Sequence, residues 1–191
     1  MNTHSVSIHG LIMSANPAEA TGLEYALLGF LSRQPRHGYD LHKELSNLEG
    51  IGLVWHVKQA HLYALLDKLE NRGLVTSQVI ASDTYPPRKE YKPTQAGIQA
   101  FEKWMLSPVE HGRELRQDFL TKLYFARLQG GDTAGRVVEA QREFLFDLQA
   151  RLENKDKHLS DSQSFEKQVY QFRIKQIRAF IDWLDTCLME Y

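Results

Sequence analysis

The stretch from Lys58 to Pro93 constrains the fold of this chain more than any other segment. Four leucines recur there at intervals of three and four residues, the spacing of a helix with one buried face: Leu62, Leu65, Leu66 and Leu69. Gly73 follows at the position where a left-handed C-terminal cap would end that helix. Two short runs of strand-like composition come next, joined by a turn-like segment with two prolines. A helix that leads directly into a hairpin is the second half of a winged helix-turn-helix, and this fold is our hypothesis.

Two helices are predicted ahead of this stretch, and together with it they would make a three-helix core. The first begins near Leu23 and ends before Pro35, because proline disfavours helical geometry in the residue before it. Its apolar face comprises Leu23, Ala26, Leu27, Phe30 and Leu31. His37 and Gly38 are predicted to form the next turn. Four residues of the second helix are expected to pack inward, namely Tyr39, Leu41, Leu45 and Leu48.

The chain after the hairpin is predicted to be helical to its end. Thr94 is the expected N-cap of a helix whose apolar side comprises Ala96, Ile98, Phe101, Trp104 and Met105. A break at residues 107–112 marks the expected domain boundary. The predicted organisation is therefore a flexible N-terminal tail (1–21), a winged-helix DNA-binding domain (22–107) and a helical dimerisation domain (108–191).

The dimerisation domain is predicted to contain two long helices, over about 133–157 and 165–189. In the first, apolar residues recur every seventh position and indicate a coiled-coil-like seam: Val138, Leu145, Leu152 and Leu159. The second has a wide apolar face: Val169, Phe172, Ile177, Phe180, Ile181, Leu184 and Leu188. The two helices can cover each other as an antiparallel hairpin. Their aromatic residues exceed what that hairpin needs, so we expect a second subunit to cover the excess.

The helix after Lys58 has the features of one that binds in the major groove of DNA. Opposite its leucines it presents small alanines, which allow a close approach to the groove. Its polar side chains could reach base edges or phosphates. The candidate DNA-binding residues on it are Lys58, Gln59, His61, Tyr63 and Lys68. The alternative is a solvated face on a structural helix.

The tip of the predicted hairpin adds a cationic pair, Arg88 and Lys89, directly after two prolines. Adjacent cations repel each other, but against a phosphate backbone they release counterions and gain salt-dependent affinity. We therefore interpret this pair as a phosphate contact. An ordinary exposed turn with two charges is the alternative.

Four segments of the chain resemble the PadR family of transcriptional regulators, in the branch whose long helical C-terminal domain is related to virulence activators. They are LEYALLGFL at Leu23 to Leu31, HGYDL at His37 to Leu41, LYALLDKLENRGLV at Leu62 to Val75, and PRKEYKPTQAG at Pro87 to Gly97. Their order and spacing carry the resemblance. It implies a mainly α fold, with a winged helix-turn-helix followed by a helical, coiled-coil-like dimerisation domain. It also implies a homodimer that binds double-stranded DNA at a pseudo-palindromic operator, and we expect this dimer to act as a repressor.

On the family pattern, the residues in DNA-facing elements are Tyr39, Gln59, His61, Tyr63, Arg88 and Lys89. Two departures from the pattern matter. The run from Lys58 to His61 stands where relatives often carry small residues, so the operator sequences of relatives do not predict the operator of this protein. Glu90 stands where another aromatic is common before Tyr91, and we expect this to alter the packing of the wing.

The resemblance also suggests a small aromatic effector, because PadR relatives include phenolic-acid and multidrug sensors. Four aromatic residues could line a pocket for it: Phe101, Trp104, Phe119 and Trp183. Aromatic residues at helical spacing are more often part of a core, and that alternative stays open.

Other classes of function find little support in the residues. The eight histidines invite a metal hypothesis, but the pairs His37 and His42, and His56 and His61, lack the spacing of a metal site, so we expect neither metal nor cofactor. The chain has no nucleophile elbow, P-loop or dinucleotide fingerprint, and an enzyme is not expected. Cys187, the one cysteine, is expected to be buried and inert.

Composition limits the compartment in which we expect the protein, and it leaves one alternative function. The net charge of −1 requires any nucleic-acid surface to be a local patch. The apolar runs are too short to span a bilayer, and a single cysteine favours a reducing compartment, so we expect a cytoplasmic protein without membrane contact. The rival function is a winged-helix protein-interaction scaffold that does not bind DNA. The cationic pair Arg88 and Lys89, together with Gln59 and Tyr63, argues against it, because a protein-binding winged helix would not need that polar, cationic combination.

Overall fold

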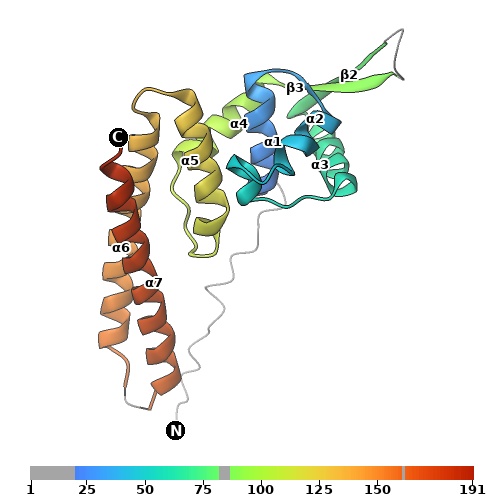
Figure 1. Ribbon diagram of the computed structural model, residues 1–191. Coiled ribbons are helices and arrows are strands. Elements are labelled where there is room, and N and C mark those ends of the chain that lie inside the picture. The colour runs from blue at the N-terminus through green and yellow to red at the C-terminus, as the bar shows by residue number, and fades with distance from the viewer. Residues whose placement is uncertain (1–19, 82–86, 161) are drawn as a thin grey trace.

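The computed structural model describes residues 20–81, 87–160 and 162–191, and it shows a mainly helical chain in two parts (Figure 1). One part holds a small antiparallel sheet with the strand order β1-β3-β2, and the other is a long helical hairpin. The predicted fold class, a winged helix followed by a helical C-terminal region, is confirmed. Most of the expected tail, residues 1–19, lies outside the described residues.

Helix α1 (Gly22–Arg33) is the central element of the first part. It packs against α3, α4, α5 and β3, and all five residues of its predicted apolar face are buried. Its N-terminus carries a capping box that we did not predict: Thr21 Oγ1 accepts a hydrogen bond from the Glu24 amide, and the Glu24 carboxylate accepts one from the Thr21 amide. Thr21, the last residue of the expected tail, is therefore the N-cap of this helix.

Glu24 is fully buried and also ties α1 to α3 (Gln59–Asn71). Its Oε1 lies 3.1 Å from Lys68 Nζ and 3.5 Å from an Arg72 guanidinium nitrogen. Burial alone would raise the pKa of Glu24, but the hydrogen bonds from Thr21 and Lys68 outweigh it, so the pKa lies below its ordinary value. The carboxylate therefore stays charged in the core and holds two helices together.

Helix α2 (Gly38–Leu45) is shorter than predicted, and this corrects two of its expected core residues. Leu41 and Leu45 are buried as expected, but the side chain of Tyr39 is 57% exposed and that of Leu48 is 77% exposed. Leu48 lies beyond the end of the helix, in the loop before a short 3₁₀ helix (η2, Gly50–Leu53), so helical spacing does not apply to it. Tyr39 lies in the first turn of α2, where it faces away from the core.

Helix α3 and the hairpin follow the prediction closely. Lys58 is the N-cap of α3, and Gly73 has the positive φ of 69° that a left-handed cap requires. Strand β2 (Val75–Ile80) pairs antiparallel with β3 (Arg88–Pro93), with Val75 opposite Pro93. The predicted turn at His37 is instead a two-residue strand, β1 (Arg36–His37), on the other edge of β3.

Helix α4 (Gln95–Leu106) connects the sheet to the second part, and Thr94 caps it as predicted, with Oγ1 3.1 Å from the Gly97 amide. Gly97 allows α4 to lie against the residue that precedes β2, because a Cβ there would come within 2.1 Å of the Leu74 carbonyl oxygen. Phe101 and Met105 are buried, whereas Ala96 is exposed and does not belong to the apolar side.

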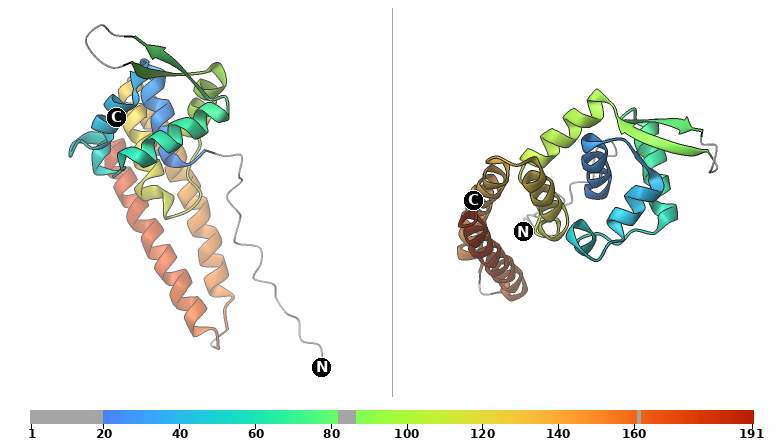
Figure 2. Two further views of the ribbon diagram at one scale, coloured as in Figure 1. Left: turned by 90° about the vertical axis from the view of Figure 1, so that its right-hand side faces the viewer. Right: turned by 45° about the horizontal axis from the view of Figure 1, so that its top comes forward.

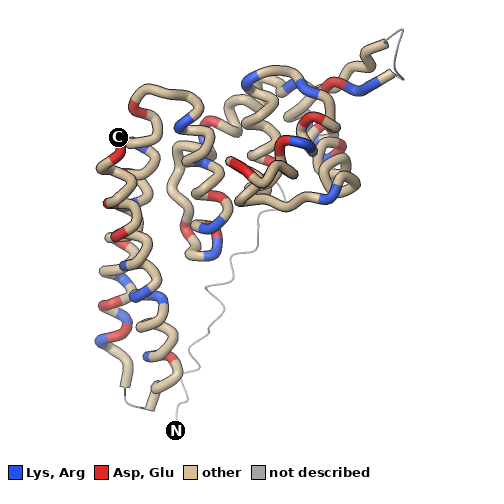
Figure 3. Tube along the Cα trace, in the orientation of Figure 1, with Lys and Arg blue, Asp and Glu red and all other residues tan. Residues whose placement is uncertain are grey.

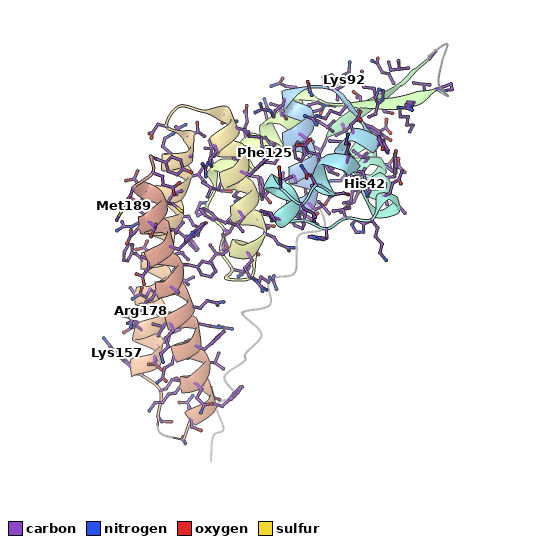
Figure 4. All side chains as sticks on the ribbon, in the orientation of Figure 1. His42, Lys92, Phe125, Lys157, Arg178 and Met189 are labelled. Carbon is purple, nitrogen blue, oxygen red and sulfur yellow. The ribbon has the colours of Figure 1, made fainter. Side chains whose placement is uncertain are left out.

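Helix α5 (Asp118–Gln129) follows a 3₁₀ turn (η3, Glu114–Arg116) and packs on α1, α4 and α6. Phe125 lies between α5 and the first part, as Figure 4 shows, and its ring meets Phe30 and Phe101 edge-on. Lys122 is buried on the same helix, and its Nζ donates a 2.6 Å hydrogen bond to the Ser107 carbonyl. Burial lowers the pKa of Lys122 to about 8. The two parts therefore share a packed junction, and the division of the chain at residue 107 stays a prediction.

Helices α6 (Thr133–Lys157) and α7 (Ser164–Leu188) form the antiparallel hairpin that the seven-residue pattern predicted. Val138, Leu145 and Leu152 are buried along the seam, facing Ile174, Ile177, Ile181 and Leu184 of α7. The far half of the hairpin extends away from the rest of the chain in both views of Figure 2. Phe172, expected on the apolar face, is 65% exposed. Among the described residues, no helix is both long and apolar enough to cross a membrane.

Candidate nucleic-acid interface

A concave surface lies where α2, α3 and the sheet meet, and it encloses a volume of about 540 Å³. Its lining residues come from four elements, and five of them are candidate DNA-binding residues. The lining comprises His37, Gly38, Tyr39, Gln59, Tyr63, Asp67, Pro87, Arg88, Lys89 and Tyr91. We refer to this surface as the α3–wing surface. The sheet extends beyond α3 on its outer side (Figure 1).

The angle between α2 and α3 depends on a close contact at Gly38. A Cβ at that position would come within 2.6 Å of the Tyr63 ring, so only glycine lets the start of α2 pack directly on α3. His42 fixes the loop that precedes α3, because its Nε2 lies 3.1 Å from the Val57 carbonyl oxygen. These contacts hold Tyr39 and Tyr63 together on the α3–wing surface.

The wing is attached to the rest of the fold by β1 and by α3. His37 Nδ1 lies 3.1 Å from the Lys89 carbonyl oxygen, across the pairing of β1 with β3. Tyr91 is buried beneath the sheet, and burial raises its pKa to about 12. Glu90, the departure from the family pattern, accepts a 3.2 Å hydrogen bond from Gln78 on β2. The position before Tyr91 therefore contributes a polar cross-strand contact to the wing.

Five predicted contact residues come together on the α3–wing surface: Tyr39, Gln59, Tyr63, Arg88 and Lys89. Arg88 and Lys89 lie in the first two positions of β3, the blue stretch of the wing in Figure 3, whereas Tyr85 and Pro86 of the predicted tip lie outside the described residues. Elsewhere Figure 3 shows acidic and basic residues interspersed, so the negative net charge does not exclude a local basic strip.

The other three candidates on α3 lie elsewhere. Lys58 is exposed at the N-cap, one residue before the helix. His61 is exposed on the flank of α3 that also carries Lys68, since residues seven apart align on a helix. Lys68 is bound to Glu24 and does not lie on the α3–wing surface. Its role in DNA binding stays a prediction, and its observed contact is structural.

His37 and Asp67 also line the α3–wing surface, and neither is among the predicted contact residues. His37 belongs to the short strand β1, which pairs with a segment far along the chain, so no local pattern could reveal it. Asp67 follows Gln59 and Tyr63 at intervals of four residues, and this spacing places it on the same face of α3. The sequence shows that placement, but an acidic residue is not expected to face DNA.

The four aromatic residues proposed for an effector pocket form two pairs. Trp104 lies 6.2 Å from Phe101 between ring centroids, and its ring also stacks on Tyr25 at 4.6 Å. Phe119 and Trp183 meet edge-on at 5.9 Å. Phe101 and Phe119 are buried, which is typical of core residues. The effector pocket stays a prediction.

Two of the histidines and the cysteine have structural surroundings. His37 and His42 contact backbone carbonyls. Within the described ranges, no three His, Cys, Asp or Glu side chains are grouped so that they could hold a metal ion. Cys187 is half-buried, and burial raises the pKa of its thiol, with Glu190 adding to the effect. The reactive thiolate is therefore disfavoured at neutral pH.

Comparison with known proteins agrees with this geometry. Residues 27–103 match the transcriptional regulator PadR-like family, and residues 115–191 match the virulence activator alpha C-terminal family. The negative transcriptional regulator PadR of Bacillus subtilis is 25% identical over 176 residues, which cover 87% of this chain and 95% of that protein.

Several solved structures of similar proteins match nearly the whole chain. One is Bacillus subtilis PadR in complex with operator DNA, with a TM-score of 0.46, 21% identity, and coverage of 91% of this chain and 99% of that one. Another is the Vibrio cholerae virulence activator AphA, with a TM-score of 0.38, 27% identity, and coverage of 88% and 96%. Members of the family are transcriptional regulators and not enzymes. With the matches of its two parts taken together, this chain belongs to the PadR-like family of transcriptional regulators, with a C-terminal region of the virulence activator type.

Proposed function

We propose that this DNA-binding regulator acts as a homodimeric repressor on a pseudo-palindromic operator. In this proposal α3 of each protomer enters a major groove, and the two grooves lie about one helical turn apart. Arg88 and Lys89 contact the flanking phosphates. The observation that carries the proposal is the gathering of Tyr39, Gln59 and Tyr63 with these two cations on the α3–wing surface. The Bacillus subtilis relative, which is named a negative transcriptional regulator, supports repression.

The second subunit is proposed to pack on α7. Phe165 and Phe172 are 72% and 65% exposed, and being seven residues apart they lie on one side of the helix. This side is roughly opposite the one that packs on α6, so the protomer leaves both rings uncovered. Exposed aromatic residues in a row are typical of a protein–protein interface. A C2 dimer through this face would bring two α3–wing surfaces to one DNA duplex.

A small aromatic effector is a further part of the proposal. Its support is Trp183, which meets Phe119 edge-on while 37% of its surface is exposed. This ring lies between α5 and α7, away from the α3–wing surface. A ligand bound beside the Trp183 ring would therefore affect DNA binding only through the packing of the helices.

The decisive experiment measures binding to the DNA upstream of the chain's own gene, at two salt concentrations, with the Arg88→Ala/Lys89→Ala variant alongside. We expect the variant to bind all duplexes more weakly. Log affinity falls with log salt by a slope of about 0.9 for each phosphate that the protein neutralises. Removal of two cations from each protomer should therefore flatten that slope by up to about four. Fluorescence anisotropy with labelled duplex gives both the affinity and the slope.

The outcome that contradicts this proposal is equally clear. If the wild-type protein bound neither the upstream region nor random duplex at low salt, the protein-scaffold function would replace it. If the protein bound DNA but the double variant kept the wild-type affinity and salt slope, the wing would not contact phosphates. Lys103→Ala, on the exposed side of α4, is a matched control that removes a cation away from the α3–wing surface.

A different result is expected for the recognition helix. Glutamine can make two hydrogen bonds to adenine, and each such pairing discriminates against other bases by about 1–3 kcal/mol. Because a dimer would lose two such pairings, Gln59→Ala should reduce the ratio of operator to random affinity by about thirtyfold or more, while leaving the affinity for random duplex nearly unchanged. His61→Ala should likewise shift the preferred sequence. Selection of bound sequences from a random pool measures both effects, and an unchanged preference in both variants would remove these residues from base recognition.

A further inference from the structure

Glu70 occupies the last turn of α3, where its carboxylate faces the wing. Its Oε1 accepts two hydrogen bonds from Ser77 on β2, one from the amide at 3.1 Å and one from the hydroxyl at 2.6 Å. The side chain is 33% exposed. The Ser77 hydroxyl lowers the pKa of Glu70, and the charge of Lys89 lowers it further against the opposing effect of burial. The carboxylate is therefore ionised and held in one orientation.

The second oxygen of this carboxylate faces one of the two wing cations. Glu70 Oε2 lies 3.6 Å from Lys89 Nζ, and the same ammonium lies 6.0 Å from the centroid of the Tyr91 ring. The Lys89 side chain is 49% exposed, so it can reach solvent or a phosphate as well. In the protein without DNA, Lys89 is thus already paired with an anion of its own chain.

A phosphate that approached the wing would compete with Glu70 for this ammonium. The two hydrogen bonds from Ser77 keep the carboxylate on β2, so it cannot follow Lys89 toward DNA. When Lys89 leaves Glu70 for a phosphate, the Glu70 carboxylate stays close to the bound DNA without a cation to neutralise it. The contact of Lys89 with DNA therefore replaces an existing ion pair, which makes it weaker than the contact of an unpaired lysine.

We propose that Glu70 is a positioning residue for DNA binding, which holds Lys89 against α3 and reduces the affinity of the wing for phosphates of any sequence. The proposal rests on the proposed function. Its consequence is that non-specific binding is kept weak, since phosphate contacts are the main source of affinity for random DNA. Base contacts from α3 then account for a larger share of the discrimination between the operator and other sites.

The test is Glu70→Gln, measured with random duplex and with operator at low salt. Glutamine keeps a side-chain oxygen that can accept the hydrogen bonds from Ser77, but it has no charge to hold Lys89. Exposed ion pairs are worth little individually, so we expect affinity for random duplex to rise by about two- to five-fold. The rise should be absent when Glu70→Gln is made in a Lys89→Ala background, because the effect acts through Lys89.

Glu90→Gln is the matched control, because it removes one negative charge from the strand that carries Lys89 without touching the pair between Glu70 and Lys89. We expect it to have a smaller effect than Glu70→Gln. If Glu70→Gln raised the affinity for random duplex equally in the Lys89→Ala background, the proposal would be overturned in favour of a general effect of charge. If Glu70→Gln instead lowered that affinity, the role of Glu70 would be only to attach the wing to α3. Wild-type binding that Glu70→Gln leaves unchanged would also overturn it. Wild-type protein that binds no duplex would instead overturn the proposed function itself, which is a distinct outcome.

Discussion

Replacement of Phe165 and Phe172 with aspartate is expected to convert the proposed dimer into a monomer and to weaken operator binding by about a hundredfold or more. Both rings are exposed in the protomer and lie on one side of α7. Two carboxylates on each protomer would face those of the other across a symmetric interface, where they would be desolvated and would repel each other. A monomer would bind one half-site at a time, without the gain in affinity that comes from linked sites.

Sedimentation velocity at several protein concentrations gives the oligomeric state, and anisotropy gives the affinity for DNA. Leu48→Asp is the matched control, since it also places a charge on an exposed apolar residue but lies in the first part of the chain. The control should sediment like the wild-type protein. A double aspartate variant that remained dimeric at micromolar concentration would show that the subunits do not meet at this face of α7.

Replacement of Glu24 with alanine is expected to lower the free energy of unfolding by about 2–3 kcal/mol. The change removes charge-assisted hydrogen bonds and half of the capping box. We place the effect below that of a fully buried ion pair, because the Lys68 side chain is 47% exposed and can be solvated after the change. The thermal midpoint should fall by about 5–10 °C. Glu102→Ala, an exposed glutamate on α4, should change the free energy of unfolding by less than about 0.5 kcal/mol.

The contribution of Glu24 should also depend on pH in a defined direction. Its pKa in the folded protein lies below the ordinary value of 4.5, so the native state favours the charged form more than the unfolded chain does. The stabilisation is complete above pH 4.5 and is lost as the pH falls through the folded pKa. In urea unfolding, the difference between wild-type protein and Glu24→Gln should therefore narrow below pH 4.5. A difference that stayed constant through this range would show that the charge of Glu24 does not contribute.

Local patterns were sufficient to predict most of the helices and the wing. The helix predicted over 133–157 has those bounds in the structure, because a long seven-residue repeat needs no tertiary information. The caps at Gly73 and Thr94 were likewise predicted, since each depends on residue type and position alone. Helical spacing predicts Tyr63 on the side of α3 opposite the leucines, with Gln59 flanking that side, and the structure places both on the α3–wing surface.

Contacts between distant segments could not be predicted in this way. The strand β1 is only two residues long and exists because it pairs with β3. The ion pairs of Glu24 with Lys68 and of Glu70 with Lys89 join elements whose relative placement is set by the folded core. The sequence could therefore not reveal that Lys68, a candidate DNA-binding residue, contacts Glu24. The exposure of Leu48 is not evident from the sequence because the end of α2 at Leu45 has no strong stop signal, and that of Tyr39 because the orientation of the first turn is set by how α2 packs on α3.

The packing around α1 has a consequence for operator architecture. One helix contacts α3 on one side and α5 on another, and the junction contains the buried Lys122. In a dimer joined through α7, the path from the twofold axis to each α3 would therefore run through packed helices, without a flexible tether. The distance between the two α3 helices of such a dimer would be fixed. The dimer would therefore tolerate base changes between the half-sites far better than an added or deleted base pair.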